Sequence, residues 1–441
     1  MKKSANRPRV HIPEPRAQAA QLIHTSLANK QPLDQLLSDA EITRMSASDQ
    51  AFCRAMVYST LRRLTVLNQL IDEALDRPLP AEAAAVRSVL QVALAQAFFM
   101  DVKDHAVVSC AVADVGRNPK LRRYKPLVNG VLRGLLRDRE RIEAFCHKPL
   151  ASLPNWLKRR WQRQYGSKRL ATLAAAVLAE PPLDITCKSD IADWATRLEG
   201  KQIGPQTVRL GARPAVASLP GYAEGHWWVQ DISASLPAQL LPLSADKSVA
   251  DLCAAPGGKT MQIAATGAQV TAVDISPGRL RRLQQNLQRT GLNAEIVTGN
   301  IHTLTPTQQF DCVLLDAPCS ATGTIRRHPE IMHLRNDQDI ADRSREQHQL
   351  LDMLDKWLKP GGTAIYAVCS MEAAEGEEVI AAFLDRSDQF ERVVIKPSEC
   401  APFSEAVTGD GDLRITPPGP AQALLEGGCD GFFISRLRKR A

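Results

Sequence analysis

The sequence lacks the segments that would place it in a membrane or outside the cell. None of its apolar runs approaches the roughly 20 residues needed to cross a bilayer, since even residues 83–100 contain four polar or charged side chains. No apolar segment follows the basic stretch Met1 to Arg16, which argues against a secretory signal. Low-complexity tracts are absent, and 44% of the 441 residues are hydrophobic. We therefore expect a cytoplasmic globular protein of roughly three domains with no membrane role.

Motifs for structural metals are also missing. The ten cysteines include no Cys-x-x-Cys pair and no Cys/His set at zinc-finger spacing, so we predict no metal site. Without a secretory signal the thiols should stay reduced. We expect most of them to be small buried apolar side chains and a few to be reactive.

Two common nucleotide-binding patterns do not occur either. Gly258-Lys259-Thr260 resembles the end of a phosphate-binding loop, but the first glycine of that motif would fall at Cys253. The dinucleotide pattern Gly-x-Gly-x-x-Gly is absent. These absences exclude a nucleotide hydrolase of that type and weaken the interpretation as a dehydrogenase.

Positive charge is concentrated in the first third of the chain. Residues 1–150 carry 23 Lys and Arg against 15 Asp and Glu, whereas the remaining residues carry 32 against 33. The densest basic stretch consists of Arg117, Lys120, Arg122, Arg123, Lys125, Arg133, Arg137, Arg139 and Arg141, with Tyr124 among them. A solvated helix face is the commoner explanation of such a run, but the asymmetry between the two parts of the chain favours a surface that follows nucleic-acid phosphates.

The hydrophobic pattern divides the chain into three regions. Leu64, Leu67 and Ile71 recur at helical spacing, and only helical patterns occur over residues 16–141. Prolines then break the pattern, and a basic amphipathic segment from Trp156 opens a mixed region. We predict an all-helical domain over 1–145, a connecting α+β domain over 146–243 and a third domain over 244–441.

In the third region apolar strands alternate with helices. The expected strands are Val249 to Cys253, Gln269 to Asp274, Glu295 to Thr298, Phe310 to Asp316, Thr363 to Cys369, Arg392 to Ile395 and Gly431 to Leu437. A helix over Gly278 to Thr290 would present leucines on one face and arginines on the other. This alternation predicts a doubly wound α/β sheet of seven strands, with ligands at the carboxyl ends of the strands.

The first strand of this sheet leads into a loop suited to a cofactor. Small residues follow Cys253 and let the backbone approach a ligand, and the start of the next helix offers N–H groups to an anionic group. Asp274 ends the second strand, where a carboxylate can accept hydrogen bonds from ribose hydroxyls. A helix N-cap is the alternative role for Asp274.

Several motifs carry a resemblance to a known family. Asp251-Leu-Cys-Ala-Ala-Pro-Gly-Gly-Lys259 and Ala272-Val-Asp274 resemble motifs I and II of the S-adenosylmethionine-dependent RNA cytosine-5 methyltransferases of the Sun/Fmu family. The resemblance continues in Gly225-His-Trp-Trp-Val-Gln-Asp-Ile-Ser233, Asp316-Ala-Pro-Cys-Ser-Ala-Thr-Gly323, Ile325-Arg-Arg-His-Pro-Glu330, Tyr366-Ala-Val-Cys-Ser370 and Asp430-Gly-Phe-Phe433. The helical part, with Asn129-Gly-Val-Leu-Arg133, resembles the antitermination-factor-type RNA-binding domain of the bacterial enzymes that methylate small-subunit ribosomal RNA.

The resemblance implies a Rossmann-like methyltransferase domain, preceded by an all-α RNA-binding domain and a small mixed domain, with S-adenosylmethionine as cofactor. The residues it places at the cofactor are Cys253, Ala254, Ala255, Pro256, Gly257, Gly258, Lys259, Asp274, Asn300 and Asp316. Asn300 stands where the family usually has Asp, so its amide oxygen can accept a hydrogen bond but brings no charge.

The chemistry requires a cysteine, because carbon 5 of cytosine becomes a nucleophile only after a thiolate adds to carbon 6. Cys319 and Cys369 should follow neighbouring strands about 4.8 Å apart, and their spacing does not decide between them. The resemblance makes Cys369 the nucleophile and gives Cys319 a role in releasing the methylated product. It also implies that Asp316 holds the base at nitrogen 3 and the exocyclic amine, and that Lys259 orients the base or Asp316.

The sequence departs from the family near the nucleophile, where Val368 replaces a Thr and the segment Met371 to Gly376 replaces one that usually ends in Glu-Asn. The loss of that Asn would slacken the turn of the nucleophile. The expected partner is 16S rRNA, free or in a partly assembled small subunit, bound by a monomer. A tRNA substrate, or an RNA-binding assembly factor without activity, is the alternative.

Overall fold

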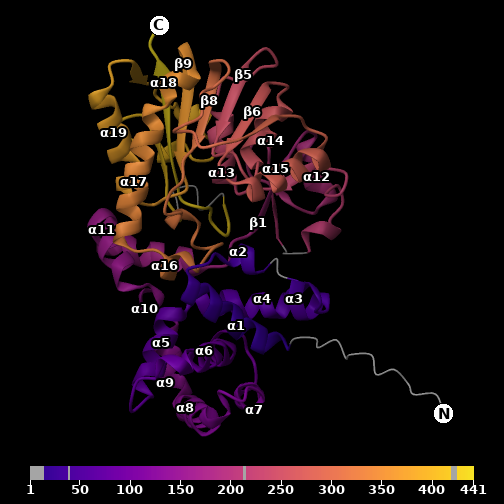
Figure 1. The fold of residues 1–441 in the computed structure, drawn as a ribbon, viewed down its shortest axis with the longest axis vertical. Coiled ribbons are helices and arrows are strands. Elements are labelled where there is room, and N and C mark those ends of the chain that lie inside the picture. Colours follow the sequence, from indigo (N-terminus) through magenta and orange to yellow (C-terminus); the bar gives the residue numbers. More distant parts are fainter. Residues whose placement is uncertain (1–13, 38–39, 212–214, 419–424) are drawn as a thin grey trace, which may run out of the picture. The chain divides into compact units, whose positions relative to one another are not determined.

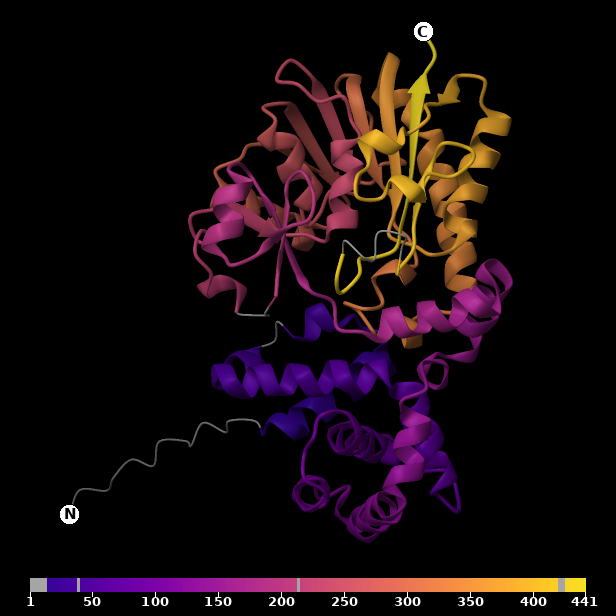
Figure 2. The same ribbon diagram turned by 180° about the vertical axis from the view of Figure 1, so that it is seen from behind.

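The computed structural model describes residues 14–37, 40–211, 215–418 and 425–441, so most of the basic stretch Met1 to Arg16 lies outside the described residues. By its contacts the chain forms two compact units (Figures 1 and 2). The helical unit comprises Met1–Leu178 together with His328–Leu334, and the sheet unit comprises Ala179–Arg327 and Arg335–Ala441. The three-domain division at residues 145 and 243 stays a prediction.

The helical unit confirms the helical pattern predicted for residues 16–141. Its helices are α1 (Pro15–Asn29), α2 (Leu33–Leu36), α3 (Ala40–Thr43), α4 (Ala47–Arg62), α5 (Leu64–Glu73), α6 (Ala84–Phe99), α7 (Asp104–Arg117), α8 (Lys125–Arg137), α9 (Arg139–Cys146), α10 (Pro149–Ser152) and α11 (Asn155–Leu178). Helix α6 is buried on nearly every side, because it packs against α1, α4, α5, α7 and α8, and its polar side chains Ser88, Gln91 and Gln96 are buried together with its apolar ones. No described helix is long and apolar enough to cross a membrane.

A short stretch from far along the chain completes this unit. It contains α16 (Ile331–Leu334), in which Met332 is fully buried. The amide of Leu33 donates to the Glu330 carboxylate (3.4 Å), and the Trp156 indole donates to the Met332 carbonyl (3.0 Å). His333 Nε2 lies 2.9 Å from the Leu61 carbonyl. Residues 328–334 are therefore an integral part of the helical unit.

The position of His333 predicts acid sensitivity. Burial lowers the pKa of His333 to about 4, against about 6.5 in an unfolded chain. Between these values the unfolded chain binds more protons, so the free energy of unfolding should fall as the pH drops from 6.5 to 4. His333→Gln, which does not titrate, should lose about 1–3 kcal/mol less than the wild type over this window.

Urea unfolding followed by circular dichroism at pH 7 and pH 4.5 measures this difference. A His105→Gln variant is the control, because the His105 side chain is exposed. Equal losses in the wild type and His333→Gln would contradict the prediction.

The large sheet of the sheet unit confirms the predicted fold class. Its strands are β5 (Ser248–Leu252), β6 (Gln269–Asp274), β7 (Glu295–Thr298), β8 (Phe310–Asp316), β9 (Leu358–Val368), β10 (Phe390–Arg392), β11 (Leu413–Ile415) and β12 (Phe432–Lys439). The order is β10-β12-β9-β8-β5-β6-β7, and β11 pairs with β12. Strands β5 to β9 run parallel to their neighbours among themselves, whereas β10, β11 and β9 are antiparallel to β12.

Three details of the predicted strands are wrong. Strand β9 begins at Leu358, five residues before the expected start at Thr363. Strand β11 is an eighth strand that was not expected, and the sixth expected strand, Arg392 to Ile395, is β10 at Phe390–Arg392. The chain leaves the sheet early because its backbone hydrogen bonds to β12 do not continue past Val393. The Val393 amide still donates to the Arg436 carbonyl of β12 (2.8 Å), but that of Ile395 donates to the Gly411 carbonyl (2.9 Å).

Helices cover both faces of this sheet (Figures 1 and 2). They are α13 (Ile232–Gln239), α14 (Gly258–Ala265), α15 (Pro277–Thr290), α17 (Asp337–Asp352), α18 (Leu354–Trp357) and α19 (Glu377–Arg386). Successive strand residues point to opposite faces: in β8, Cys312 and Leu314 join the core with α13, whereas Val313 and Leu315 join the core with α17, α18 and α19. Because both faces are buried at the centre of the sheet, the central strands β8 and β9 contain continuous apolar runs, residues 312–315 and 364–368.

A second, four-stranded sheet precedes the large one. It consists of β1 (Leu183–Cys187), β2 (Lys201–Gln202), β3 (Thr207–Leu210) and β4 (Trp227–Val229) in the order β2-β3-β1-β4, all antiparallel, with α12 (Ile191–Arg197) beside them. Asp184 and Arg209 form a buried bidentate ion pair across β1 and β3, with distances of 2.7 and 2.8 Å.

Candidate active site

The carboxyl ends of four adjacent parallel strands bring the predicted site residues to one edge of the large sheet. Strand β8 pairs with β5 on one side and with β9 on the other. The loop from Cys253 therefore follows β5, Asp316 ends β8, and Cys369 comes directly after β9. Asp274 ends β6, the neighbour of β5. Residues that are more than 100 positions apart in the sequence thus meet at this edge.

The loop after β5 is shaped by its backbone. Cys253 and Gly257 both have positive φ, 64° and 102°, and Gly257 caps the start of α14. A Cβ atom on Gly257 would lie 2.8 Å from Cγ of Leu283, so only glycine fits there. The Ala255 amide donates to Asp274 (3.1 Å), which ties the loop to the end of β6. The predicted cofactor residues 253–259 form this single loop.

Asp274 is buried and is already engaged on both oxygens. Oδ1 accepts from the Ser276 amide (2.9 Å), Oδ2 accepts from the Ala255 amide, and Nη1 of Arg279 lies 3.2 Å from Oδ2. The sequence indicated neither the loop contact nor Arg279. Each carboxylate oxygen has two lone pairs, so Asp274 can still accept from a further donor.

Asn300 follows β7, next to the end of β6. The Gly299 amide donates to the backbone carbonyl of Asp274 (3.2 Å), which sets Asn300 beside Asp274 at the same edge. The Asn300 side chain is exposed, and its Oδ1 accepts from the His302 amide (3.0 Å). The Asn300 amide oxygen, which we expected to contact the cofactor, therefore accepts a hydrogen bond within the turn that Asn300 begins.

Asp251 is a site residue that the motif contains but whose role the sequence did not predict. It is fully buried in β5, and Oδ2 accepts from the Thr260 hydroxyl (2.6 Å). Oδ1 has no hydrogen-bond partner within the described ranges. Burial raises the pKa of Asp251 to about 7. A buried acceptor without a donor within the chain can accept from a ligand or a bound water.

Lys259 and Asp316 form an ion pair at the start of α14 and the end of β8. Nζ lies 2.6 Å from Oδ2 of Asp316 and 5.3 Å from the centroid of the Phe432 ring. Burial alone would lower the pKa of Lys259, but the adjacent Asp316 carboxylate outweighs it and raises the pKa overall. Lys259 is therefore a permanent cation whose position is fixed against Asp316.

The two candidate cysteines are in contact. Their Sγ atoms are 3.4 Å apart, which agrees with the expectation that both thiols reach the same place. The hydrogen bond with Cys369 raises the pKa of Cys319 well above its ordinary value, and burial raises it further. Cys319 consequently carries its proton at neutral pH.

Glu375 joins the two loops that carry these cysteines, a role that sequence reasoning missed. Its buried carboxylate accepts from the Ser320 amide (2.7 Å) and from the hydroxyls of Ser320 and Ser370, the residues after each cysteine. Gln347 of α17 donates to the same carboxylate (3.3 Å) and to the Pro318 carbonyl (2.8 Å). The only signal in the sequence was the position of Glu375 in the segment Met371 to Gly376.

Arg414 of β11 holds the loop that carries Cys369 from the other side. Its Nη1 donates to the Ser370 carbonyl (2.5 Å), and its Nε donates to Glu377 (2.9 Å). The guanidinium lies over the Phe433 ring, 4.8 Å from its centroid. A Cβ on Gly376 would come within 2.4 Å of Nη2, so the glycine leaves space for this guanidinium. The expected slackening of the turn at Gly376 is therefore opposed by Arg414.

We expect Glu375→Ala to destabilise the sheet unit by about 3 kcal/mol, because it leaves several buried donors of the two loops unpaired. Glu375→Gln keeps one acceptor and should cost less. Urea unfolding measures both, and Glu378→Ala, at an exposed position three residues further on, should change stability by no more than about 0.5 kcal/mol. Equal effects of Glu375→Ala and Glu378→Ala would contradict this prediction.

The sheet order and the loops at its carboxyl edge define a Rossmann-like methyltransferase with a helical unit attached. The family model described as 16S rRNA methyltransferase RsmB/F matches residues 238–438, and the NusB family model matches residues 13–137. The chain belongs to this family of 16S rRNA methyltransferases, which confirms the resemblance noted in the sequence. S-adenosylmethionine is its cofactor.

Curated relatives match nearly the whole chain. It is 35% identical over 451 residues to the ribosomal RNA small subunit methyltransferase B of Klebsiella pneumoniae, covering 96% of this chain and 98% of the relative. The corresponding protein of Salmonella newport is 36% identical over 445 residues, with the same coverage.

Solved structures show the same fold. The structure of PH0851 superposes with a TM-score of 0.78 at 21% identity, covering 98% of this chain and all of the other. A methyltransferase homolog protein from Pyrococcus horikoshii has a TM-score of 0.54 at 28% identity, with 64% of this chain and 93% of the other covered.

Proposed function

We propose that this chain methylates carbon 5 of a cytosine in 16S rRNA through a covalent bond between Cys369 and the base. The observation that carries the proposal is the contact between two thiols, 3.4 Å apart, beside the Lys259–Asp316 pair. Cytosine carbon 5 is activated only when a nucleophile adds to carbon 6. Only one thiol is needed for that attack. The presence of Cys319 beside Cys369 therefore supports a second thiol-dependent step, the release of the product.

The site fits the cofactor. Asp274 can accept from ribose hydroxyls, the loop 253–259 offers its backbone, and the unpaired Oδ1 of Asp251 can accept from an amine. Asn300 follows the end of β7 and Asp316 ends β8, and both are proposed to contact the cofactor. When bound, S-adenosylmethionine supplies the activated methyl group. The chain's own residues bind, orient and activate the base.

In the first step the Cys369 thiolate forms a bond to carbon 6, and the electron pair of the double bond becomes available at carbon 5. The Asp316 carboxylate accepts from the exocyclic amine, and it holds nitrogen 3 through a proton that is shared between the carboxylate and nitrogen 3. The Lys259 ammonium, 2.6 Å from Asp316, offsets the negative charge that attack places on the ring. A charge fixed in advance in a buried site needs no reorganisation during the reaction.

In the last step Cys319 assists release of the product. Its hydrogen bond with Cys369 is the largest cause of its raised pKa. That hydrogen bond is lost once Cys369 is bonded to carbon 6. Cys319 then loses its proton to solvent more easily. Its thiolate can take the proton from carbon 5, the electron pair of that C–H bond re-forms the double bond to carbon 6, and Cys369 leaves as a thiolate.

The partner follows from the family and from the helical unit. We propose that a monomer acts in the cytoplasm on 16S rRNA that is free or in a partly assembled small subunit. The basic helical unit supports an RNA partner.

We expect Asp274→Ala to weaken S-adenosylmethionine binding tenfold to a hundredfold, since a hydrogen bond to a charged group contributes about 1.5–3 kcal/mol. Asp274→Asn, which keeps the shape, should lose less. Isothermal titration calorimetry measures both, with the exposed Asp388→Ala as a control of equal charge change. Unchanged affinity in Asp274→Ala would remove Asp274 from the cofactor site.

Substitution of the two cysteines should block the reaction at different stages: before methyl transfer for Cys369, and after methyl transfer for Cys319. Cys369→Ala should abolish methylation and form no covalent complex with RNA. Cys319→Ala should attack and methylate, then stall with RNA attached. Denaturing gel electrophoresis with labelled 16S rRNA should show a slow, protease-sensitive band only for Cys319→Ala.

Cys312→Ala is the matched control, because Cys312 is buried in the core of β8 away from this pair. It should methylate without a trapped band. A band for Cys369→Ala alone would transfer the nucleophile to Cys319, and intact methylation without a band in either variant would refute covalent catalysis.

A further inference from the structure

A groove of about 780 Å³ lies between α7 and α8 of the helical unit, and neither the cofactor site nor the cysteine pair accounts for it. Cavities of this size accommodate ligands as large as a nucleotide. Its apolar part comes from Val108, Val112 and Leu136. Arg133 and Arg137 line it from α8. The groove thus combines an apolar surface with two cations.

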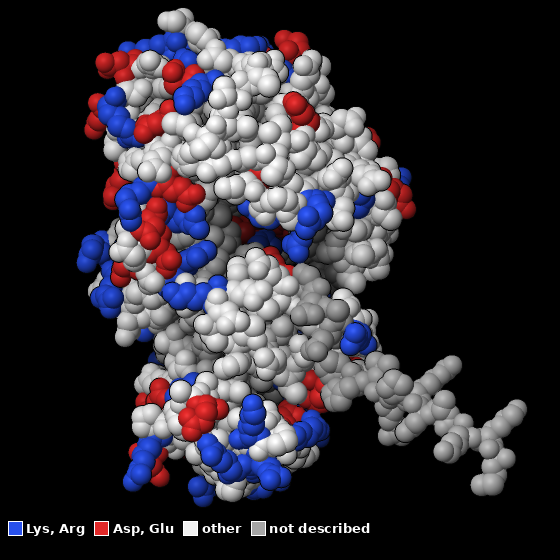
Figure 3. Space-filling view, viewed as in Figure 1, with Lys and Arg blue, Asp and Glu red and all other residues white. Residues whose placement is uncertain are grey.

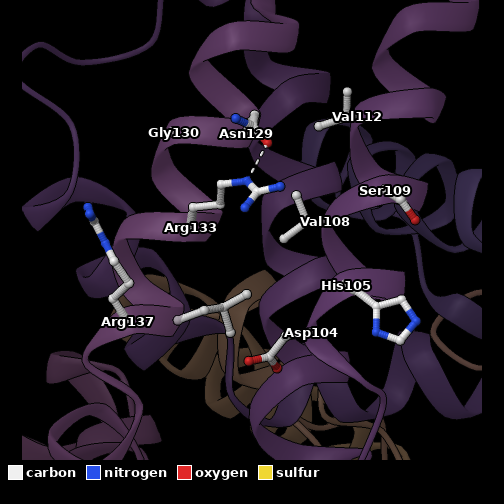
Figure 4. A pocket seen from close by; sticks show the side chains of 10 residues that line it. Asp104, His105, Val108, Ser109, Val112, Asn129, Gly130, Arg133 and Arg137 are labelled. Atoms are coloured by element: carbon white, nitrogen blue, oxygen red, sulfur yellow. Dashed lines mark hydrogen bonds between the residues drawn. The ribbon is translucent and has the colours of Figure 1, made fainter.

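Arg133 is held in position before any ligand arrives. Its Nε donates to Oδ1 of Asn129, one turn earlier in α8, at 3.0 Å. Figure 4 shows the guanidinium between Asn129 and Val108, with the side chains of His105 and Ser109 on α7 beyond it. The Nη groups remain available as donors. Asn129 and Arg133 are the first and last residues of the motif Asn129-Gly-Val-Leu-Arg133, which carries the family resemblance of the helical part.

The charges of the basic stretch differ in how they are used. Four of its nine cations are paired with carboxylates: Arg117 with Asp114, Arg123 with Glu82, Arg139 with Asp104 and Glu143, and Arg141 with Asp138. The other five, Lys120, Arg122, Lys125, Arg133 and Arg137, have no ion pair among the described residues. Figure 3 shows Lys and Arg side chains gathered over the end of the unit that carries α7 and α8. The acid in the groove, Asp104, is the one paired with Arg139, so the groove keeps a positive charge.

Gly130 leaves the backbone of α8 bare inside the groove. It lies in the middle of the helix, where glycine is the least favourable residue after proline. Its φ is not positive, and no described atom lies within 4 Å of the Cβ that another residue would add. Neither backbone conformation nor packing within the chain therefore requires glycine here. The space that a side chain would fill at Gly130 is therefore open to a ligand in the groove.

We propose that this groove binds an unpaired stretch of the RNA substrate. The guanidiniums of Arg133 and Arg137 contact phosphates, and a base lies against the apolar surface beside Gly130. A duplex would present phosphates alone, whereas a single strand presents phosphates and base faces together. The inference rests on the proposed function only in taking RNA as the substrate.

The test compares two double variants of the full chain that remove the same charge. Arg133→Gln/Arg137→Gln should weaken binding of in vitro transcribed 16S rRNA. The plot of log affinity against log salt has a negative slope, and this variant should make it shallower by about 0.7 per lost phosphate contact. Arg117→Gln/Arg141→Gln removes two cations that are already paired, and it should leave the slope unchanged. Filter binding over a series of salt concentrations measures both.

A second pair of variants tests the shape of the groove. Gly130→Gln should raise the KM for RNA several-fold and leave kcat unchanged. Gly134→Gln, on the same helix but not lining the groove, should change neither. Equal salt slopes for the two arginine variants, or equal KM for the two glycine variants, would overturn the proposal and leave the groove to a ligand other than RNA. Because filter binding requires no methyl transfer, a failure of cytosine methylation would overturn the proposed function while this test remains valid.

Discussion

The buried carboxylate of Glu375 is the interaction on which the geometry of the site depends. Parallel pairing of β8 and β9 delivers two loops to the same edge of the sheet, but pairing alone does not fix where the sulfur atoms lie. Glu375 does so by accepting hydrogen bonds from Ser320 and Ser370, each adjacent to a cysteine. Because these donors are buried, losing their common acceptor costs far more than losing an exposed contact.

Much of this arrangement could be predicted from the sequence. The bounds of β6, β7 and β8 were predicted to the residue, because short segments rich in apolar residues alternate with turn and helix signals along this part of the chain. The site motifs follow these strands directly, so their meeting point was predictable too. Glu375 and Arg414 were missed, since their partners lie on other loops and no periodicity relates them. The strand at Phe390–Arg392 was misplaced because Val393 and Ile395 are apolar, although their backbone bonds go to different partners.

The number of charged residues along a segment does not show which of those charges are available on the surface. The density of Arg and Lys over residues 117–141 suggested a surface that follows nucleic-acid phosphates, with a solvated helix face as the alternative. Local carboxylates neutralise Arg117, Arg139 and Arg141, which a count of residues over a long segment cannot show. Arg133 differs because its hydrogen-bond partner, Asn129, is uncharged. Asn129 orients the guanidinium without neutralising its positive charge. Ion pairing, both within a helix and with neighbouring elements, therefore decides which cations are left for a ligand.

The inclusion of residues 328–334 in the helical unit has a consequence for synthesis on the ribosome. This unit begins the chain, yet it cannot be completed until Leu334 has emerged, long after its first helices. During that interval the Leu33 amide, the Leu61 carbonyl and the Trp156 indole lack the partners they have in the finished protein. The strands β5 to β8 leave the ribosome before the helical unit can close. The order in which the chain is made is thus not the order in which its two units can be finished.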